Sequence, residues 1–215
     1  MNKAEISKRI IEIGIVPVVR ASSPAQAVAA AEAVCAGGIS VVEVTMTVPG
    51  AVEVIAQLVK KMGSAVIVGA GTVLNAESAR RCLDAGAQFL VSPGFDLGTV
   101  KFACSQGVLM MAGALTPTEV ITAWDAGSDF VKIFPCGNVG GAKYIKALKG
   151  PLPQIPMVPT GGVNLNTAAE FIQAGSAAVG VGGELVLAAA LKSGDMREIT
   201  ELAKRYVSIV REARG

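Results

Sequence analysis

The chain contains no histidine among its 215 residues, which excludes every imidazole-based mechanism and every histidine metal site. Its four cysteines, Cys35, Cys82, Cys104 and Cys136, are scattered without a Cys-x-x-Cys pair. A zinc site is therefore not expected, and we interpret the cysteines as reduced thiols that mostly serve packing.

Charge and long apolar runs are also scarce. Charged residues make up 17% of the chain, the net charge is +2, and no cluster of lysine and arginine stands out, so nucleic acid is not an expected partner. No run approaches the ~18 apolar residues of a membrane-spanning helix. Residues 1–13 lack the apolar core of a signal peptide and instead carry apolar residues at helical spacing. These features predict a cytoplasmic protein with no membrane partner.

The chain does have 52% hydrophobic residues, arranged in eight short apolar runs. The runs start roughly 20–27 residues apart, which fits one strand plus one helix with short connections. Near-continuous apolar runs are typical of parallel strands that are covered on both faces. The eight runs are 15–20, 41–47, 65–73, 88–93, 108–115, 130–135, 157–163 and 177–185.

Helical segments with recognisable ends lie between these runs. Capping residues and first-turn prolines predict helices at 25–35, at 76–84, and from Thr116 to Trp124. Four predicted helices end in the phrase Ala-Gly, where glycine fits the left-handed residue that closes a helix. Eight strand-then-helix units without a linker favour a (β/α)₈ TIM barrel with an N-terminal helix, as one domain over residues 1–215. A doubly wound sheet usually has fewer strands and a glycine fingerprint near its start, and no such fingerprint is present.

One lysine and one glutamate stand out within the strand-like runs. Phe130, Lys132 and Phe134 share one face of an extended chain, so Lys132 points where two aromatic rings point. Glu43 lies on the polar face of its own run, opposite Val42 and Val44. If those valines pack on helices, Glu43 and Lys132 both face the barrel interior and are expected to meet.

Two interpretations of this pair remain. A buried ion pair is the structural one, although such pairs roughly break even against apolar packing. In the functional one, Lys132 attacks a carbonyl carbon to form a Schiff base while Glu43 transfers protons. The sequence shows no metal site that would polarise a carbonyl, so iminium formation is the remaining way to stabilise a neighbouring carbanion. We favour the functional interpretation.

The other run ends fit a small anionic substrate. Gly161-Gly162 and Gly182-Gly183 end the last two runs, where backbone N–H groups of barrels often bind phosphate. Thr72 ends the third run, either beside the reacting centre or as a helix cap. Pro93 ends the fourth, where it either stiffens the mouth or simply turns the chain.

Five segments, in order, resemble a known family. They are Glu43-Val44-Thr45, Gly69-Ala70-Gly71-Thr72-Val73, Ser92-Pro93-Gly94, Lys132-Ile133-Phe134-Pro135 and Pro159-Thr160-Gly161-Gly162-Val163. The chain resembles the 2-keto-3-deoxy-6-phosphogluconate (KDPG) and 2-keto-4-hydroxyglutarate (KHG) aldolases over nearly its whole length. The resemblance implies a class I aldolase that reversibly cleaves KDPG to pyruvate and glyceraldehyde 3-phosphate, as in the Entner–Doudoroff route. It also implies a homotrimer of (β/α)₈ barrels and a Schiff base with the substrate in place of a metal or other cofactor.

The resemblance further implies residue roles, with Lys132 as the Schiff-base lysine and Glu43 as the general acid and base. The residues implied to bind substrate around them are Thr72, Pro93, Phe134, Thr160, Gly161, Gly162 and Gly182. Related substrates, namely KHG and the 6-phosphogalactonate analogue of KDPG, remain alternatives.

The chain departs from the family pattern at two places. Many members carry an arginine four residues after the glutamate, where this chain has Thr47, and Arg20 is a candidate replacement cation. Many carry a serine that helps to bind phosphate, where this chain has Gly183 beside Glu184. A carboxylate that pointed inward there would repel a phosphate.

Two rivals come from other classes. A barrel isomerase or epimerase would share the glycine-rich anion site, but the familiar versions rely on histidine or on metals bound by it. A non-catalytic or engineered assembly subunit on the same barrel would associate through exposed apolar patches, for which the alanine-rich segments 25–35 and 185–191 are candidates.

Overall fold

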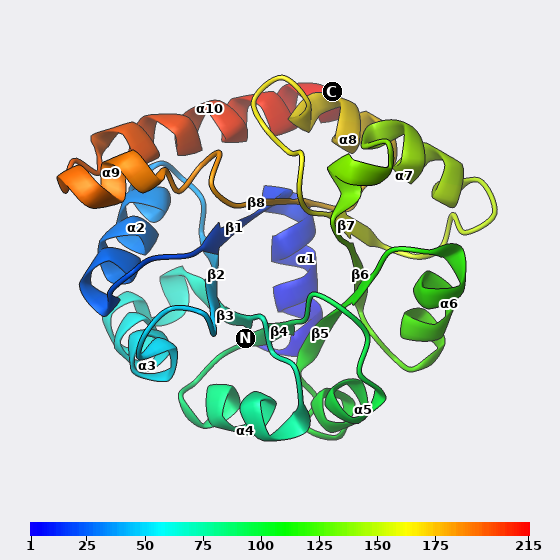
Figure 1. Cartoon of the computed structure of the whole chain (residues 1–215), viewed down its shortest axis with the longest axis horizontal. Helices are drawn as coiled ribbons and strands as arrows, with labels where there is room; N and C mark the ends of the chain where they lie inside the picture. The colour runs from blue at the N-terminus through cyan, green and yellow to red at the C-terminus, as the bar shows by residue number, and fades with distance from the viewer.

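The computed structural model describes all residues 1–215 and shows eight parallel strands ringed by helices (Figure 1). The sheet order is β7-β6-β5-β4-β3-β2-β1-β8, and a parallel bridge between Thr160 and Gly180 joins β7 to β8. The predicted (β/α)₈ barrel is therefore confirmed, with strands shorter than the apolar runs. The strands are β1 (Ile15–Val19), β2 (Val41–Thr45), β3 (Ile67–Gly71), β4 (Phe89–Val91), β5 (Leu109–Ala114), β6 (Phe130–Ile133), β7 (Met157–Pro159) and β8 (Val179–Val181).

The helices alternate with the strands as the sequence predicts. The predicted segment 25–35 corresponds to a helix that is one residue longer at each end, and 76–84 matches a helix with the same bounds. The glycines in the four Ala-Gly phrases include Gly38, Gly86, Gly127 and Gly175, and all four have positive φ. The helices are α1 (Lys3–Ile13), α2 (Pro24–Ala36), α3 (Ala51–Met62), α4 (Ala76–Asp84), α5 (Leu97–Ser105), α6 (Pro117–Asp125), α7 (Ala142–Lys149), α8 (Ala168–Gln173), α9 (Ala188–Ser193) and α10 (Arg197–Arg214), with short 3₁₀ turns η1 (Gly63–Ala65) and η2 (Cys136–Val139). None of these helices combines the length and apolarity needed to cross a bilayer.

Helix α1 closes the N-terminal end of the barrel. Its Ile6 and Ile10 are buried in a cluster with side chains from the inner faces of the strands, among them Phe89 and Phe130. Figure 1 shows α1 across the middle of the strand ring. The lower half of the lumen is therefore a packed apolar core, as barrel interiors generally are.

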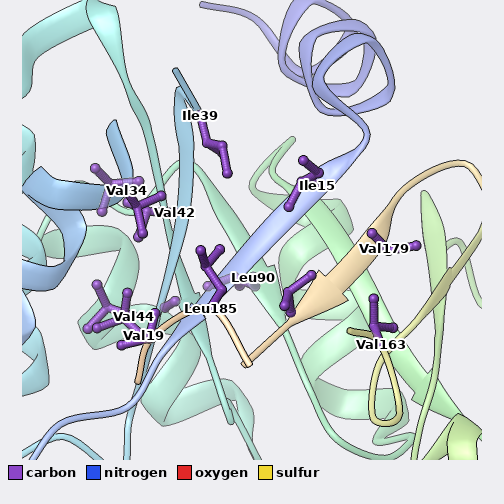
Figure 2. Close-up of a cluster of buried hydrophobic side chains, with 14 of the residues drawn as sticks. Ile15, Val19, Val34, Ile39, Val42, Val44, Leu90, Val163, Val179 and Leu185 are labelled. Carbon is purple, nitrogen blue, oxygen red and sulfur yellow. The ribbon is translucent and has the colours of Figure 1, made fainter. Parts of the chain in front are cut away.

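A larger apolar layer fills the space between strands and outer helices. Val42 and Val44 of β2 and Val131 and Ile133 of β6 belong to it, as the alternation along both runs predicts. Figure 2 shows Ile15, Val42 and Val44 among the side chains of this layer. Because successive residues of a strand point to opposite faces, Glu43 and Lys132 point into the lumen.

Helix α9 begins later than the predicted alanine-rich segment 185–191. The backbone N–H groups of Leu185 and Val186 both donate to the Gly182 carbonyl, which folds this part of the chain into a turn. Leu185 and Val186 are buried, and so are six of the apolar residues of α2. Neither segment presents the continuous exposed apolar face that the assembly-subunit hypothesis requires.

Candidate active site

The lumen near the C-terminal ends of the strands holds one amine and one carboxylate, from opposite sides of the barrel. Glu43 comes from β2 and Lys132 from β6, four strands away in the sheet order. Lys132 Nζ lies 3.7 Å from Glu43 Oε1, and the two residues are only 5% and 2% exposed. This distance is too long for a hydrogen bond but lies within the range of an ion pair. The predicted meeting of the two residues is confirmed.

The Glu43 carboxylate has room because its neighbours on β3 lack side chains. A Cβ built at Gly71 would lie 1.9 Å from Glu43 Oε1, so only glycine leaves the carboxylate where it is. Glu43 Oε1 is buried and accepts no hydrogen bond from the protein. A buried acceptor without a partner destabilises a fold, and it is available to a group that enters the lumen.

The amine of Lys132 lies near the ring of Phe134, with Nζ 5.5 Å from the ring centroid. The Phe134–Pro135 peptide bond is cis. Phe134 is half-buried and lines a hollow at the ends of β7 and β8. An ammonium at this distance is attracted by the face of the ring, which helps to fix its position.

A hollow of about 130 Å³ lies at the ends of β7 and β8, and Phe134 is part of its lining. We call it the glycine hollow. Of the predicted residues, it brings together Arg20, Phe134, Thr160, Gly161, Gly162, Gly182 and Gly183.

The glycine hollow is rich in free hydrogen-bond donors. The backbone N–H groups of Gly161, Gly162, Gly182 and Gly183 donate to no acceptor in the protein. The guanidinium of Arg20 forms no ion pair or hydrogen bond within the protein. A cluster of free backbone donors beside one free cation is suited to a small anion.

Thr160 lines the glycine hollow from the end of β7. It is buried, its N–H donates to the Ile133 carbonyl, and its carbonyl accepts from Cys136. A Cβ at Gly180 would lie 2.1 Å from Thr160 Oγ1, so glycine at that position is what admits the threonine side chain. Thr160 is thus fixed by β6 and β8 together.

Thr72, Pro93 and Thr47 lie outside the lining of the glycine hollow. Thr72 follows Gly71 with φ of 58°, an uncommon conformation for a β-branched residue. Because Asn75 caps α4, the alternative of Thr72 as a helix cap is wrong. Pro93 packs its backbone over Gly113 on β5, the strand next to Lys132.

Thr47 does not point a free side chain at the lumen. Strand β2 ends at Thr45, and the two hydroxyls, Thr45 Oγ1 and Thr47 Oγ1, are 2.7 Å apart. Thr45 Oγ1 in turn donates to the Val19 carbonyl. Thr47 is exposed, and its hydroxyl reinforces the contact between β1 and β2 just below Arg20.

Two contributors to the site were not singled out from the sequence. Gly113 leaves the space over which Pro93 and Gly94 fold, since a Cβ there would lie 2.2 Å from the Pro93 carbonyl carbon. Ser92 holds the same turn, because its hydroxyl donates to the Gly94 carbonyl and accepts from the Gly113 N–H. The only sequence signal for Gly113 is a glycine at an inward position of an apolar run.

At Gly183 the chain departs from the family pattern, and the carboxylate of the next residue, Glu184, lies at the rim of the glycine hollow. Gly183 and Glu184 are both exposed and both line the glycine hollow. Glu184 forms no ion pair with Arg20 across the hollow. No group of three or more histidine, cysteine, aspartate or glutamate residues is placed to hold a metal ion.

Comparisons with known proteins agree with this geometry. Residues 6–202 match the family model described as KDPG and KHG aldolase. The chain is 35% identical to 2-dehydro-3-deoxy-phosphogluconate aldolase of Treponema pallidum, over 95% of this chain and 97% of that protein. It is 37% identical to KHG/KDPG aldolase of Escherichia coli K12, over 90% of each.

Among solved structures, KDPG aldolase from Legionella pneumophila, with pyruvate captured as a covalent carbinolamine intermediate, superposes with a TM-score of 0.85. It is 30% identical and covers 92% of this chain and 96% of its own. The resemblance seen in the sequence is thereby confirmed: the chain belongs to the KDPG and KHG aldolase family.

Proposed function

We propose that the protein is a class I aldolase that reversibly cleaves KDPG to pyruvate and glyceraldehyde 3-phosphate through a Schiff base on Lys132. The observation that carries the proposal is the buried amine of Lys132, 3.7 Å from a carboxylate that no other protein group engages. The captured carbinolamine in the Legionella relative supports it, since a carbinolamine is the first adduct of an amine with a ketone.

In the proposed reaction, Lys132 Nζ attacks the C2 ketone, and Glu43 transfers the protons that let water leave as the iminium forms. The Glu43 carboxylate then accepts the C4 hydroxyl proton as the C3–C4 bond breaks. The bonding electrons pass into the enamine, and glyceraldehyde 3-phosphate is released. Glu43 returns the proton to C3, and hydrolysis of the iminium frees pyruvate and Lys132.

The glycine hollow is proposed to bind the distal phosphate. Backbone N–H groups of Gly161, Gly162, Gly182 and Gly183 would donate to its oxygens, and Arg20 would supply the positive charge. Thr160 lines this hollow and is hydrogen-bonded to Ile133, the residue after Lys132, and it would donate to the substrate carboxylate. Pro93 and Phe134 would enclose the pyruvate moiety, and Thr72 would approach it from the end of β3.

Borohydride reduction in the presence of pyruvate tests the proposal, because it converts an iminium into a stable amine. Mass spectrometry of peptides should find a pyruvyl adduct on Lys132 of the folded protein. The Lys132→Ala variant should form no adduct and lose at least roughly 10³-fold in kcat. Unmodified Lys132 in active-pH protein would sink the Schiff-base mechanism.

Lys149→Met is a matched control. Lys149 is also partly buried, but its amine donates to the Pro153 and Ile155 carbonyls rather than facing the lumen. Borohydride should still trap pyruvate on Lys132 in the Lys149→Met variant, although the variant protein is less stable than the wild type. Loss of trapping in both variants would indicate that global damage, and not the nucleophile, explains the result.

Several finer features remain predictions. A phosphorylated substrate is proposed over KHG because the glycine hollow offers four backbone N–H donors and the Arg20 cation to a distal phosphate. A side-by-side comparison of kcat/KM for the three substrates checks this preference. The homotrimer, the cytoplasmic location and the organisation as one domain rest on the family resemblance and on composition, and sedimentation of the purified protein checks the trimer.

A further inference from the structure

Glu184 lines two neighbouring hollows at the C-terminal end of the barrel, and no other residue lines both. One is the glycine hollow. The other, of about 490 Å³, lies against α10, and we call it the α10 hollow; it is lined by Asn164, Glu198, Arg205 and Tyr206 among others. Because Glu184 is exposed and forms no ion pair or hydrogen bond, its carboxylate is free to turn into either hollow.

The α10 hollow contains a donor that lacks an acceptor. Tyr206 is fully buried, and its hydroxyl has no hydrogen-bond partner in the protein. Leaving a buried hydroxyl unpaired destabilises a fold, so it needs an explanation. Burial, together with the charge of the nearby Glu184, raises the pKa of Tyr206 above its ordinary value, so this hydroxyl remains a donor at neutral pH.

The two positions of Glu184 have opposite effects on an anion in the glycine hollow. A carboxylate turned toward Arg20 neutralises the cation and repels a phosphate. A carboxylate turned into the α10 hollow would approach the Tyr206 hydroxyl and the Arg205 guanidinium, which line the same hollow, and it would leave Arg20 free. A charge-assisted hydrogen bond from a buried hydroxyl is among the stronger side-chain interactions.

We propose that Tyr206 is a positioning residue that holds the Glu184 carboxylate away from the glycine hollow and so sets the preference for phosphorylated substrates. The proposal rests on the proposed binding of phosphate in the glycine hollow. It explains how a chain with glutamate next to Gly183 accommodates a doubly charged group. It also supplies an acceptor for the buried Tyr206 hydroxyl, which has no hydrogen-bond partner in the protein.

The test compares kcat/KM for KDPG with kcat/KM for its neutral-ended counterpart, 2-keto-3-deoxygluconate. The Tyr206→Phe variant removes only the hydroxyl and should lower this ratio by about tenfold, the value expected for one hydrogen bond to a charged group. In a Glu184→Gln background, the same change should alter the ratio by less than about twofold. Glu198→Gln is the matched control, since Glu198 lines only the α10 hollow, and its ratio should stay within about twofold of the wild type.

A ratio that is unchanged in Tyr206→Phe, or that falls equally with and without Glu184, overturns the proposal. A titration of the folded protein with inorganic phosphate, followed by ³¹P NMR, decides the matter without turnover. Tyr206→Phe should weaken phosphate binding, whereas Glu184→Gln should leave it within about twofold of the wild type, since the carboxylate is already held away from the glycine hollow. If Tyr206→Phe fails to fold, a phosphate affinity that rises about tenfold or more in Glu184→Gln is by itself sufficient to reject the proposal, because the carboxylate would then already oppose phosphate in the wild type.

These outcomes separate the inference from the proposed function. A wild-type protein that forms no pyruvyl adduct on Lys132 refutes the Schiff-base mechanism, while the phosphate titration still reports on Tyr206. Conversely, normal cleavage of KDPG with no effect of Tyr206→Phe leaves the aldolase proposal intact and removes only the role of Tyr206.

Discussion

Replacing Gly71 with alanine tests whether the position of the Glu43 carboxylate, rather than its mere presence, supports turnover. The new Cβ would lie 1.9 Å from Glu43 Oε1, whereas real contacts of this kind stay beyond 3.0 Å. The oxygen, or strand β3, must therefore move by about 1.1 Å. A displacement of ~1 Å in a catalytic group costs on the order of 10²-fold in rate.

The cost in stability should be much smaller than the cost in activity. Gly71 has an ordinary backbone conformation, so alanine itself introduces no strain there. The atom that must yield is the end of a flexible side chain, which places the loss at the low end of the ~1–3 kcal/mol typical of overpacking. Gly71→Ala should thus remain folded at room temperature, with kcat about 10²-fold below the wild type.

Gly69→Ala provides the matched control on the same strand and the same inward face. Its Cβ would lie 2.3 Å from the ring of Phe89, which belongs to the apolar core inside the lumen. This variant should lose at least as much stability as Gly71→Ala, because a ring in a packed core yields less easily than a carboxylate. Its kcat should nevertheless stay closer to the wild-type value.

Steady-state cleavage of KDPG and urea unfolding measure the two quantities. A folded Gly71→Ala variant with wild-type kcat would refute the argument that Gly71 fixes the carboxylate. Equal losses of kcat in the two glycine variants would also contradict it, since the effect would then follow stability.

Three further predictions concern other parts of the chain. Thr72→Gly should raise the free energy of unfolding by about 1 kcal/mol in urea titrations, since relief of positive-φ strain outweighs the added flexibility of the unfolded chain. If the Thr72 hydroxyl contacts substrate, kcat/KM of the same variant should fall. Glu119 accepts backbone hydrogen bonds at the start of α6, chiefly from Thr116, which lowers its pKa. Its stabilisation is therefore complete above the unfolded pKa of ~4.3 and lost as the pH falls through the lower folded value, so the difference in melting temperature from Glu119→Gln should vanish in acid. Burial raises the pKa of Cys136 to about 12, so iodoacetamide at pH 8 should alkylate the exposed Cys104 first, as peptide mass spectrometry can check.

Much of the fold was predictable because side chains alternate between the two faces of a strand, so the residue pattern shows which of them face the lumen. The inward face of β6 was visible in the sequence, since Lys132 shares a face with two aromatic residues and its neighbours are aliphatic. The same logic identified Glu43, and the barrel then required the two to meet. Periodicity of two residues therefore predicted that the amine and the carboxylate meet inside the barrel, as they do.

Glycine carries no such signal, and this is where the sequence was least informative. Gly71, Gly113 and Gly180 form walls of the lumen, whereas other glycines of the same runs turn the chain, and nothing in the sequence distinguishes the two uses. Strand ends were also misjudged. The run through Thr47 stays apolar or β-branched, but the Val48 N–H bonds back to the Thr45 carbonyl and ends β2 in a turn.

The position of Glu184 between two hollows was likewise beyond the reach of the sequence. It depends on α10, some twenty residues further along the chain, passing behind the end of β8. Contacts between segments on different faces of a barrel follow from the curvature of the whole ring, which local pattern does not encode.

The packing of α1 against the base of the barrel makes the lumen a tube with one open end. Lys132, only 5% exposed, lies deeper in this tube than the exposed Gly162 and Gly183 at its opening. In the proposed reaction, the phosphorylated aldehyde would occupy the opening and the three-carbon acid would lie behind it. We therefore expect sequential release with the aldehyde first, and in the reverse direction entry of pyruvate before its partner. Pyruvate should accordingly bind to the free enzyme, whereas the aldehyde should bind productively only after pyruvate has joined the lysine.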